Sequence, residues 1–116
     1  MIVVVFEFEP DPERGSRYFE LARALREEVA RIDGFLGVER FESLQRPGRF
    51  VSLSYWRDLE AVARWKRHPA HVRAQAEGLR AGLFRDFRIT VAEVRSRRTL
   101  AEVRARRAEE SGPETG

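Results

Sequence analysis

Two hydrophobic periodicities alternate along the chain. Short stretches rich in β-branched and aromatic residues, in which apolar and polar positions alternate, predict strands over residues 1–9, 36–45, 50–56 and 84–94. Pro10 is expected to end the first strand, and the segment Arg46-Pro47-Gly48-Arg49 has the composition of a hairpin turn. The pattern therefore predicts four strands, of which the second and third form a hairpin.

Apolar residues spaced by three and four positions predict helices between the strands. The first helix is expected to run from Ser16, as its N-cap, to Ile32. Asp58 is expected to cap a second helix, which His68-Pro69 interrupts before a further helix starts at the proline. The apolar residues of this further segment are expected to lie on one side of it, and they are Val72, Ala76, Leu79 and Leu83.

The resulting order is β-α-β-β-α-β, which predicts a ferredoxin-like α+β fold with a four-stranded antiparallel sheet and the helices on one face. A sheet face open to water is usually polar. Here Val3 and Val5 lie opposite Val4 and Phe6 by strand alternation, so both faces are apolar. We therefore expect a second copy to cover the open face, which makes the protein a homodimer.

Length and composition limit the possible classes of function. The 116 residues suffice for one domain, expected over residues 1–96, and a charged tail over 97–116 in which Thr99 caps a short helix through Glu110 before a frayed end. The absence of cysteine excludes disulfides, thiolate metal sites and cysteine nucleophiles. With no apolar run long enough to cross a bilayer and no secretory leader, we expect a cytoplasmic protein without a membrane partner.

The basic charge does not indicate a nucleic-acid partner. Of the 22 basic residues Lys66 alone is a lysine and the others are arginines, against 19 acidic residues and a net charge of +3. Most arginines share a predicted helical face with Glu or Asp, which is typical of a solvated surface. A nucleic-acid-binding protein usually carries a denser basic stripe with interleaved aromatic residues.

Three segments resemble a known family, and they are Gly34-Phe35-x-Gly37, Tyr55-Trp56-Arg57-Asp58-Leu59-Glu60-Ala61 and Arg64-Trp65-Lys66-Arg67-His68-Pro69-Ala70-His71. Together with the length and the element order, they resemble the antibiotic biosynthesis monooxygenase (ABM) superfamily of dimeric α+β barrels, over roughly residues 1–96. The resemblance implies a homodimer in which each protomer has a cleft between its sheet and its helices.

The same resemblance implies oxygenation of a small electron-rich aromatic, such as a quinol or an anthrone, by O2 without metal or flavin. Trp65 matches a tryptophan that lines the family's cleft, His71 stands where a tyrosine would be, and Ala61 replaces an asparagine. We expect His71 to act as acid or base, Trp65 and Tyr55 to wall the pocket, and His68 or Arg85 to polarise the substrate oxygen. A non-catalytic dimeric module that binds a small ligand is the alternative.

Haem degradation is a less favoured activity of the same superfamily. Members with this activity carry an asparagine in the first strand and an iron-binding histidine ten residues after the tryptophan. Glu7 and Gln75 occupy these places here. We therefore disfavour haem and expect no cofactor.

Each candidate residue also has a structural interpretation. Trp65 can pack the helix on the sheet, His68 can cap the helix that follows it, and Arg85 can be plain surface charge. Glu7 is a candidate for substrate binding, but a salt bridge with an arginine is the favoured interpretation. His68 and His71 have no third ligand at a recognisable spacing, so no metal site is expected.

Overall fold

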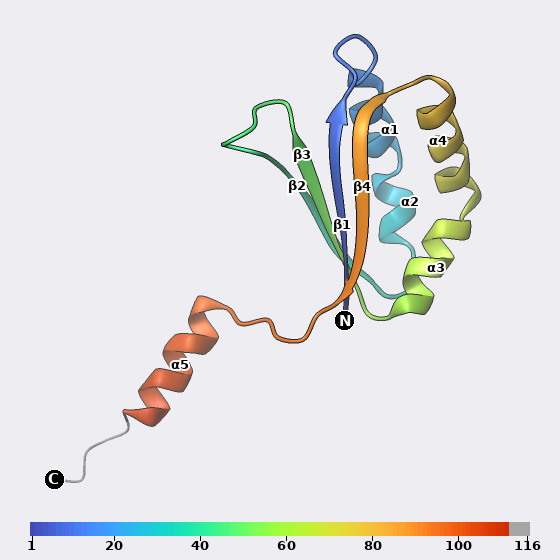
Figure 1. Ribbon diagram of the computed structural model, residues 1–116. Coiled ribbons are helices and arrows are strands. Elements are labelled where there is room, and N and C mark those ends of the chain that lie inside the picture. The colour runs from blue at the N-terminus through green and yellow to red at the C-terminus, as the bar shows by residue number, and fades with distance from the viewer. Residues whose placement is uncertain (112–116) are drawn as a thin grey trace, which may run out of the picture.

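The structure is a computed structural model that describes residues 1–111. Its four strands form one antiparallel sheet in the order β2-β3-β1-β4, and α1 to α4 lie on one face of it (Figure 1). This arrangement confirms the predicted ferredoxin-like fold. The elements are β1 (Ile2–Pro10), α1 (Ser16–Ala24), α2 (Arg26–Ala30), β2 (Phe35–Glu42), β3 (Phe50–Trp56), α3 (Leu59–Arg67), α4 (Pro69–Arg80), β4 (Phe84–Glu93) and α5 (Leu100–Glu110).

The core lies between the sheet and the helices and has two centres. At one end Ile2 pairs with Trp56 across β1 and β3, and both pack with Val29 and Ala61 from the helices. At the other end Phe8 is fully buried within a cluster of aromatic rings from both layers, which comprises Phe6, Phe8, Tyr18, Phe19, Phe50, Phe84 and Phe87. The helix-facing side of the sheet is therefore aromatic at this end.

The first helical segment departs from the prediction of a single helix starting at a serine cap. Gly15, not Ser16, is the N-cap, and no side-chain hydrogen bond caps the helix there. A Cβ atom at position 15 would collide with the Cβ atom of Pro10, because β1 continues through that proline and turns back closely. The segment then divides at Leu25 into α1 and α2, and α2 ends at Ala30, two residues before the predicted end at Ile32.

The hairpin between β2 and β3 agrees with the predicted turn, but β2 ends at Glu42, three residues earlier than expected. Gly48 has a φ of +88°, which a glycine adopts without strain. The Gly48 amide donates to the Glu42 carboxylate at 3.0 Å, and the Arg49 amide donates to the Arg46 carbonyl at 3.0 Å. The side chain of Glu42, the last residue of β2, thus stabilises the turn.

The face of α4 that points inward is not its apolar stripe. Leu83, just after the helix, is buried, but Val72 and Leu79 are 48% and 70% exposed. His71 and Gly78 are on the inner side, where Gly78 lies against Phe84. The Arg17 guanidinium on α1 donates to both oxygens of Glu77 on α4, at 2.6 and 3.2 Å, and so ties the two helices together.

The tail leaves the domain after β4. Thr99 caps α5 as predicted, with its hydroxyl accepting from the Glu102 amide at 3.1 Å, and the helix stands apart from the sheet in Figure 1. Of the expected frayed end, residues 112–116 lie outside the described residues. No helix within residues 1–111 has the length and apolarity needed to cross a membrane.

Candidate functional site

The corner between α3 and α4 brings a tryptophan and two histidines together. Asp58 caps α3 by accepting from the Ala61 amide at 2.9 Å, as predicted. The chain then turns at His68, whose extended backbone ends α3 and starts α4 at Pro69. This sharp turn places Trp65, in the last turn of α3, beside His71, in the first turn of α4.

The ring of His71 stacks on the indole of Trp65, with centroids 4.7 Å apart and 21° between the planes. The Nδ1 atom of His71 is buried and has no hydrogen-bond partner, the one such side-chain atom within residues 1–111. Burial lowers the pKa of His71, and this effect outweighs that of the Trp65 backbone, which raises the pKa. The imidazole is therefore neutral at neutral pH and holds an unused nitrogen.

His68 is occupied structurally. Its Nδ1 atom accepts a hydrogen bond from the Ala70 amide at 3.1 Å, which is the capping arrangement considered from the sequence. Its Nε2 atom lies 3.6 Å from a carboxylate oxygen of Glu28 on α2. Because Nδ1 caps α4 and Nε2 faces Glu28, both ring nitrogens of His68 are engaged and are poorly placed to polarise a substrate oxygen.

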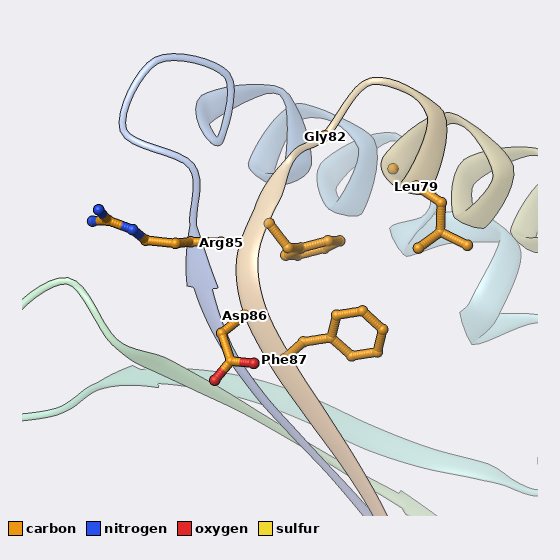
Figure 2. A pocket seen from close by; sticks show the side chains of 7 residues that line it. Leu79, Gly82, Arg85, Asp86 and Phe87 are labelled. Carbon is orange, nitrogen blue, oxygen red and sulfur yellow. The ribbon is translucent and has the colours of Figure 1, made fainter.

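A pocket with a volume of about 250 Å³ opens between the end of α4 and the start of β4 (Figure 2). In Figure 2 the side chain of Leu79 faces the ring of Phe87 across the gap, whereas Arg85 points away from both. Arg85, which was expected to polarise the substrate oxygen, therefore lies at the rim of this pocket. The lining residues are Gly78, Leu79, Gly82, Phe84, Arg85, Asp86 and Phe87.

An exposed apolar strip of β4 starts at Phe87, in the wall of the pocket. Phe87, Ile89 and Val91 are on the helix-facing side of the strand and are 43%, 52% and 49% exposed. Val91 pairs with Val4, which packs against the same cluster as Trp65. The helices thus leave β4 partly uncovered from the pocket to the Trp65 corner.

Tyr55 and Glu7 lie on the opposite face of the sheet, with Val3 and Leu53. Tyr55 and Trp65 were expected to wall one pocket, but they lie on different faces of the sheet. Alternation along β3 turns Tyr55 away from the helices while its neighbour Trp56 enters the core. The Arg97 guanidinium covers the Tyr55 ring at 4.4 Å.

Glu7 is held in the ion pair that the sequence favoured. Its two carboxylate oxygens accept from Arg88 at 2.7 and 2.9 Å across β1 and β4. These hydrogen bonds hold the pKa of Glu7 below its ordinary value. Such a carboxylate is a weak proton acceptor, and it lies on the face away from His71.

The position of the family's asparagine is closed. Ala61 is fully buried, and a Cβ atom added to Gly34 would come within 2.6 Å of the Ala61 Cβ. A larger side chain at position 61 has no room in this packing. Within the described part of the chain, no three His, Cys, Asp or Glu side chains come together as a metal site.

The sequence reasoning did not identify the walls of the pocket, Leu79 and Phe87. The sequence pattern placed Leu79 only on the apolar stripe that it shares with Leu83. A signal was nevertheless present, since Gly78 and Gly82 flank Leu79 and remove side-chain volume on the side that faces β4.

Known proteins similar to this chain point to one family. A protein of Pyricularia oryzae named jasmonate monooxygenase ABM is 42% identical over 94 residues, which are 81% of this chain and 43% of that protein, so the chain spans less than half of this relative's length. The uncharacterised protein YqjZ of Bacillus subtilis is 32% identical over 82 residues, 71% of this chain and 69% of its own.

Solved structures share the fold at lower identity. Rv0793 from Mycobacterium tuberculosis superposes with a TM-score of 0.74 at 21% identity, covering 84% of this chain and 98% of its own. A conserved protein from Methanosarcina mazei superposes with a TM-score of 0.70 at 19% identity, covering 79% and 90%. The sequence profile of the antibiotic biosynthesis monooxygenase family matches residues 1–77, and with this match the chain belongs to that family.

Proposed function

We propose that the protein is a monooxygenase that oxidises a small electron-rich aromatic with O2 and without a bound metal or flavin. The observation that carries the proposal is the unpartnered Nδ1 atom of the neutral His71 beside the flat face of Trp65, in a chain of the monooxygenase family. A neutral imidazole with a free nitrogen can accept the proton of a phenol or of an acidic methylene group.

The reaction balances without another reductant. A phenol loses its proton to His71, and the electron-rich anion passes electrons to O2. One oxygen atom enters the ring and the other leaves as water, so that phenol and O2 become benzoquinone and water. An anthrone follows the same balance, because its methylene group and O2 become a carbonyl group and water.

The surroundings of His71 suit an aromatic substrate. Trp65 supplies a flat wall, and the exposed apolar strip of β4 starts at Phe87, in the wall of the pocket. Ligand pockets typically have volumes of about 300–1,000 Å³. The pocket of about 250 Å³ therefore matches an entrance or a single small ring.

The proposed assembly is a homodimer through the open face of the sheet. Val3, Val5 and Leu53 share that face with Tyr55, and its central ion pair joins Glu7 to Arg88. A second copy would cover this apolar surface, since a face of this kind is rarely left open in a stable monomer.

A non-catalytic binding module is the second candidate, and the closed position 61 favours it. The family's asparagine amide is a donor for a developing anion, and Ala61 supplies none. On this alternative, Trp65 and His71 bind a small ligand and transfer no proton.

Oxygen consumption distinguishes the two candidates. Anthrone and 1,4-naphthoquinol, which both belong to the proposed substrate class, would each be mixed with the full chain. Uptake is measured against heat-denatured protein, which corrects for autoxidation. We expect uptake with the wild type and about a hundredfold less with His71→Phe, a loss typical of a missing general base.

Isotopically labelled O2 should place one labelled atom in the product. Uptake that His71→Phe leaves unchanged would overturn the assignment of His71. Ligand binding without uptake for every compound would favour the binding module instead.

A further inference from the structure

The helix α5 is not packed on its own domain. It stands apart from the sheet and from the other helices in Figure 1, none of its residues is buried, and the side chain of Leu100 is 64% exposed. An isolated helix of 11 residues is marginal in water, because most helical stability in proteins comes from packing of one face. The helix therefore calls for a surface outside its own protomer.

One side of α5 combines two apolar side chains with two arginines. At 3.6 residues per turn, the members of this side are Leu100, Val103, Arg104 and Arg107. Neither arginine forms an ion pair within residues 1–111, whereas the neighbouring Arg106 pairs with Glu110 at 3.3 Å. Glu102 and Glu109 lie on the opposite side of the helix. The side is thus apolar and positively charged, and it matches a surface that is apolar and negatively charged.

A surface of this kind lies on the open face of the sheet, where a pocket has a volume of about 390 Å³. Phe41 and Leu53 are among its apolar walls, and Phe41 is 44% exposed. Glu39 also lines this pocket and pairs with Leu53 across β2 and β3, which places both on the same face. Glu39 forms no ion pair within residues 1–111. The pocket therefore offers an apolar floor with one unpaired carboxylate.

The segment before α5 is anchored at the rim of this pocket. The Arg97 guanidinium lies 4.4 Å from the centre of the Tyr55 ring, and its Nη1 atom is 3.6 Å from the sulfur of Met1. The helix begins three residues later, at Leu100, and leads away from the sheet (Figure 1). The tail thus leaves its own protomer along the face that a second copy would cover.

We propose that α5 docks on the partner copy of a homodimer, with Leu100 and Val103 in the open-face pocket and the two arginines of the same side at its Glu39. In a two-fold dimer the same contact occurs twice, because the interface is isologous. Each copy then covers part of the open face of the other with its own tail. The inference rests on the proposed homodimer and is independent of the monooxygenase reaction.

Engineered cysteines test this contact directly, because the chain has no cysteine of its own. Full-length Val103→Cys and Phe41→Cys chains with different affinity tags are co-expressed, purified through both tags and mildly oxidised. A disulfide requires Cα atoms within about 7 Å of each other. We expect a covalent heterodimer on a non-reducing gel, because the tail of one chain lies against the sheet of the other.

The matched control replaces Val103→Cys by Ala105→Cys, an exposed position on the opposite side of α5. We expect about tenfold less covalent heterodimer from this pair, because its cysteine faces away from the partner. A second measurement needs no cross-link. Val103→Glu should weaken dimerisation about tenfold in analytical ultracentrifugation, whereas Ala105→Glu, with the same added charge, should leave it unchanged.

Equal cross-linking by Val103→Cys and Ala105→Cys would overturn the proposal, because that result would mean random collision. A double variant with Val103→Cys and Phe41→Cys that closes its disulfide within one chain would overturn it too, since the tail would then fold back on its own sheet. A dimeric wild type without the heterodimeric disulfide would overturn the docking of α5 and leave the proposed interface standing. A monomeric wild type would overturn both.

Discussion

The imidazole of His71 lies almost parallel to the indole of Trp65, although the two residues belong to different helices. The contact depends on the turn at His68 and on Pro69, which ends one helix and starts the next within a single residue. A continuous helix would separate the two side chains by about 9 Å along its axis. The break between α3 and α4 is thus what builds the candidate site.

The stability of the protein should fall at mildly acidic pH because of His71. Its folded-state pKa is lowered, so the unfolded chain takes up the proton first as the pH drops below about 6.5. Stability contributed by the neutral ring is complete above that pH and is lost as the pH falls through the folded-state pKa. Thermal melts between pH 8 and pH 5 should show a steeper decline for the wild type than for His71→Phe, which keeps the stack. Parallel curves would contradict this role of His71.

Replacement of His68 by alanine should destabilise the fold by about 1 kcal/mol, because the Ala70 amide loses its acceptor. His68→Asn supplies another good N-cap and should recover most of this loss. Urea unfolding of the three proteins measures the difference. If asparagine restores no stability, the imidazole contributes through its contact with Trp65 and not through the cap.

Restoring the family's asparagine should harm this protein. Ala61→Asn places a polar amide in a fully buried position against Gly34, and we expect a loss of about 2–4 kcal/mol in unfolding free energy. Ala76→Asn, at an exposed position of α4, is the matched control and should cost about 0.5 kcal/mol. A stable Ala61→Asn variant would show that the corner between Gly34 and α3 can open.

The homodimer should depend on the open face of the sheet. Leu53→Glu introduces a charge among Val3, Val5 and Tyr55 and should shift the protein to a monomer in light scattering after gel filtration. Leu44→Glu adds the same charge at a side chain that is 99% exposed and should leave the assembly unchanged. A wild-type protein that is monomeric at high concentration would refute the proposed interface.

The strands and the helix caps were predictable because their signals are local. Alternation along β1 and β3 predicted which side chains share a face, and Asp58 and Thr99 are caps because their side chains reach amides three residues on. Errors arose where contacts from distant residues decide the outcome. Gly15 replaces Ser16 as the cap because Pro10 lies against it, and β1 runs on through that proline.

The features of the candidate site can be separated in the same way, into local ones and ones that depend on distant residues. The sequence by itself determined that Trp65 and His71 flank a helix break, because His68-Pro69 is a local signal for one. It also determined that Glu7 shares a face with Val3 and Val5, because side chains alternate along a strand. Only the tertiary structure decided that Tyr55 faces away from Trp65, that Arg85 points out of the pocket and that Arg97 covers the Tyr55 ring. These relationships join segments far apart in the chain, and periodicity within one element carries no information on what packs against it.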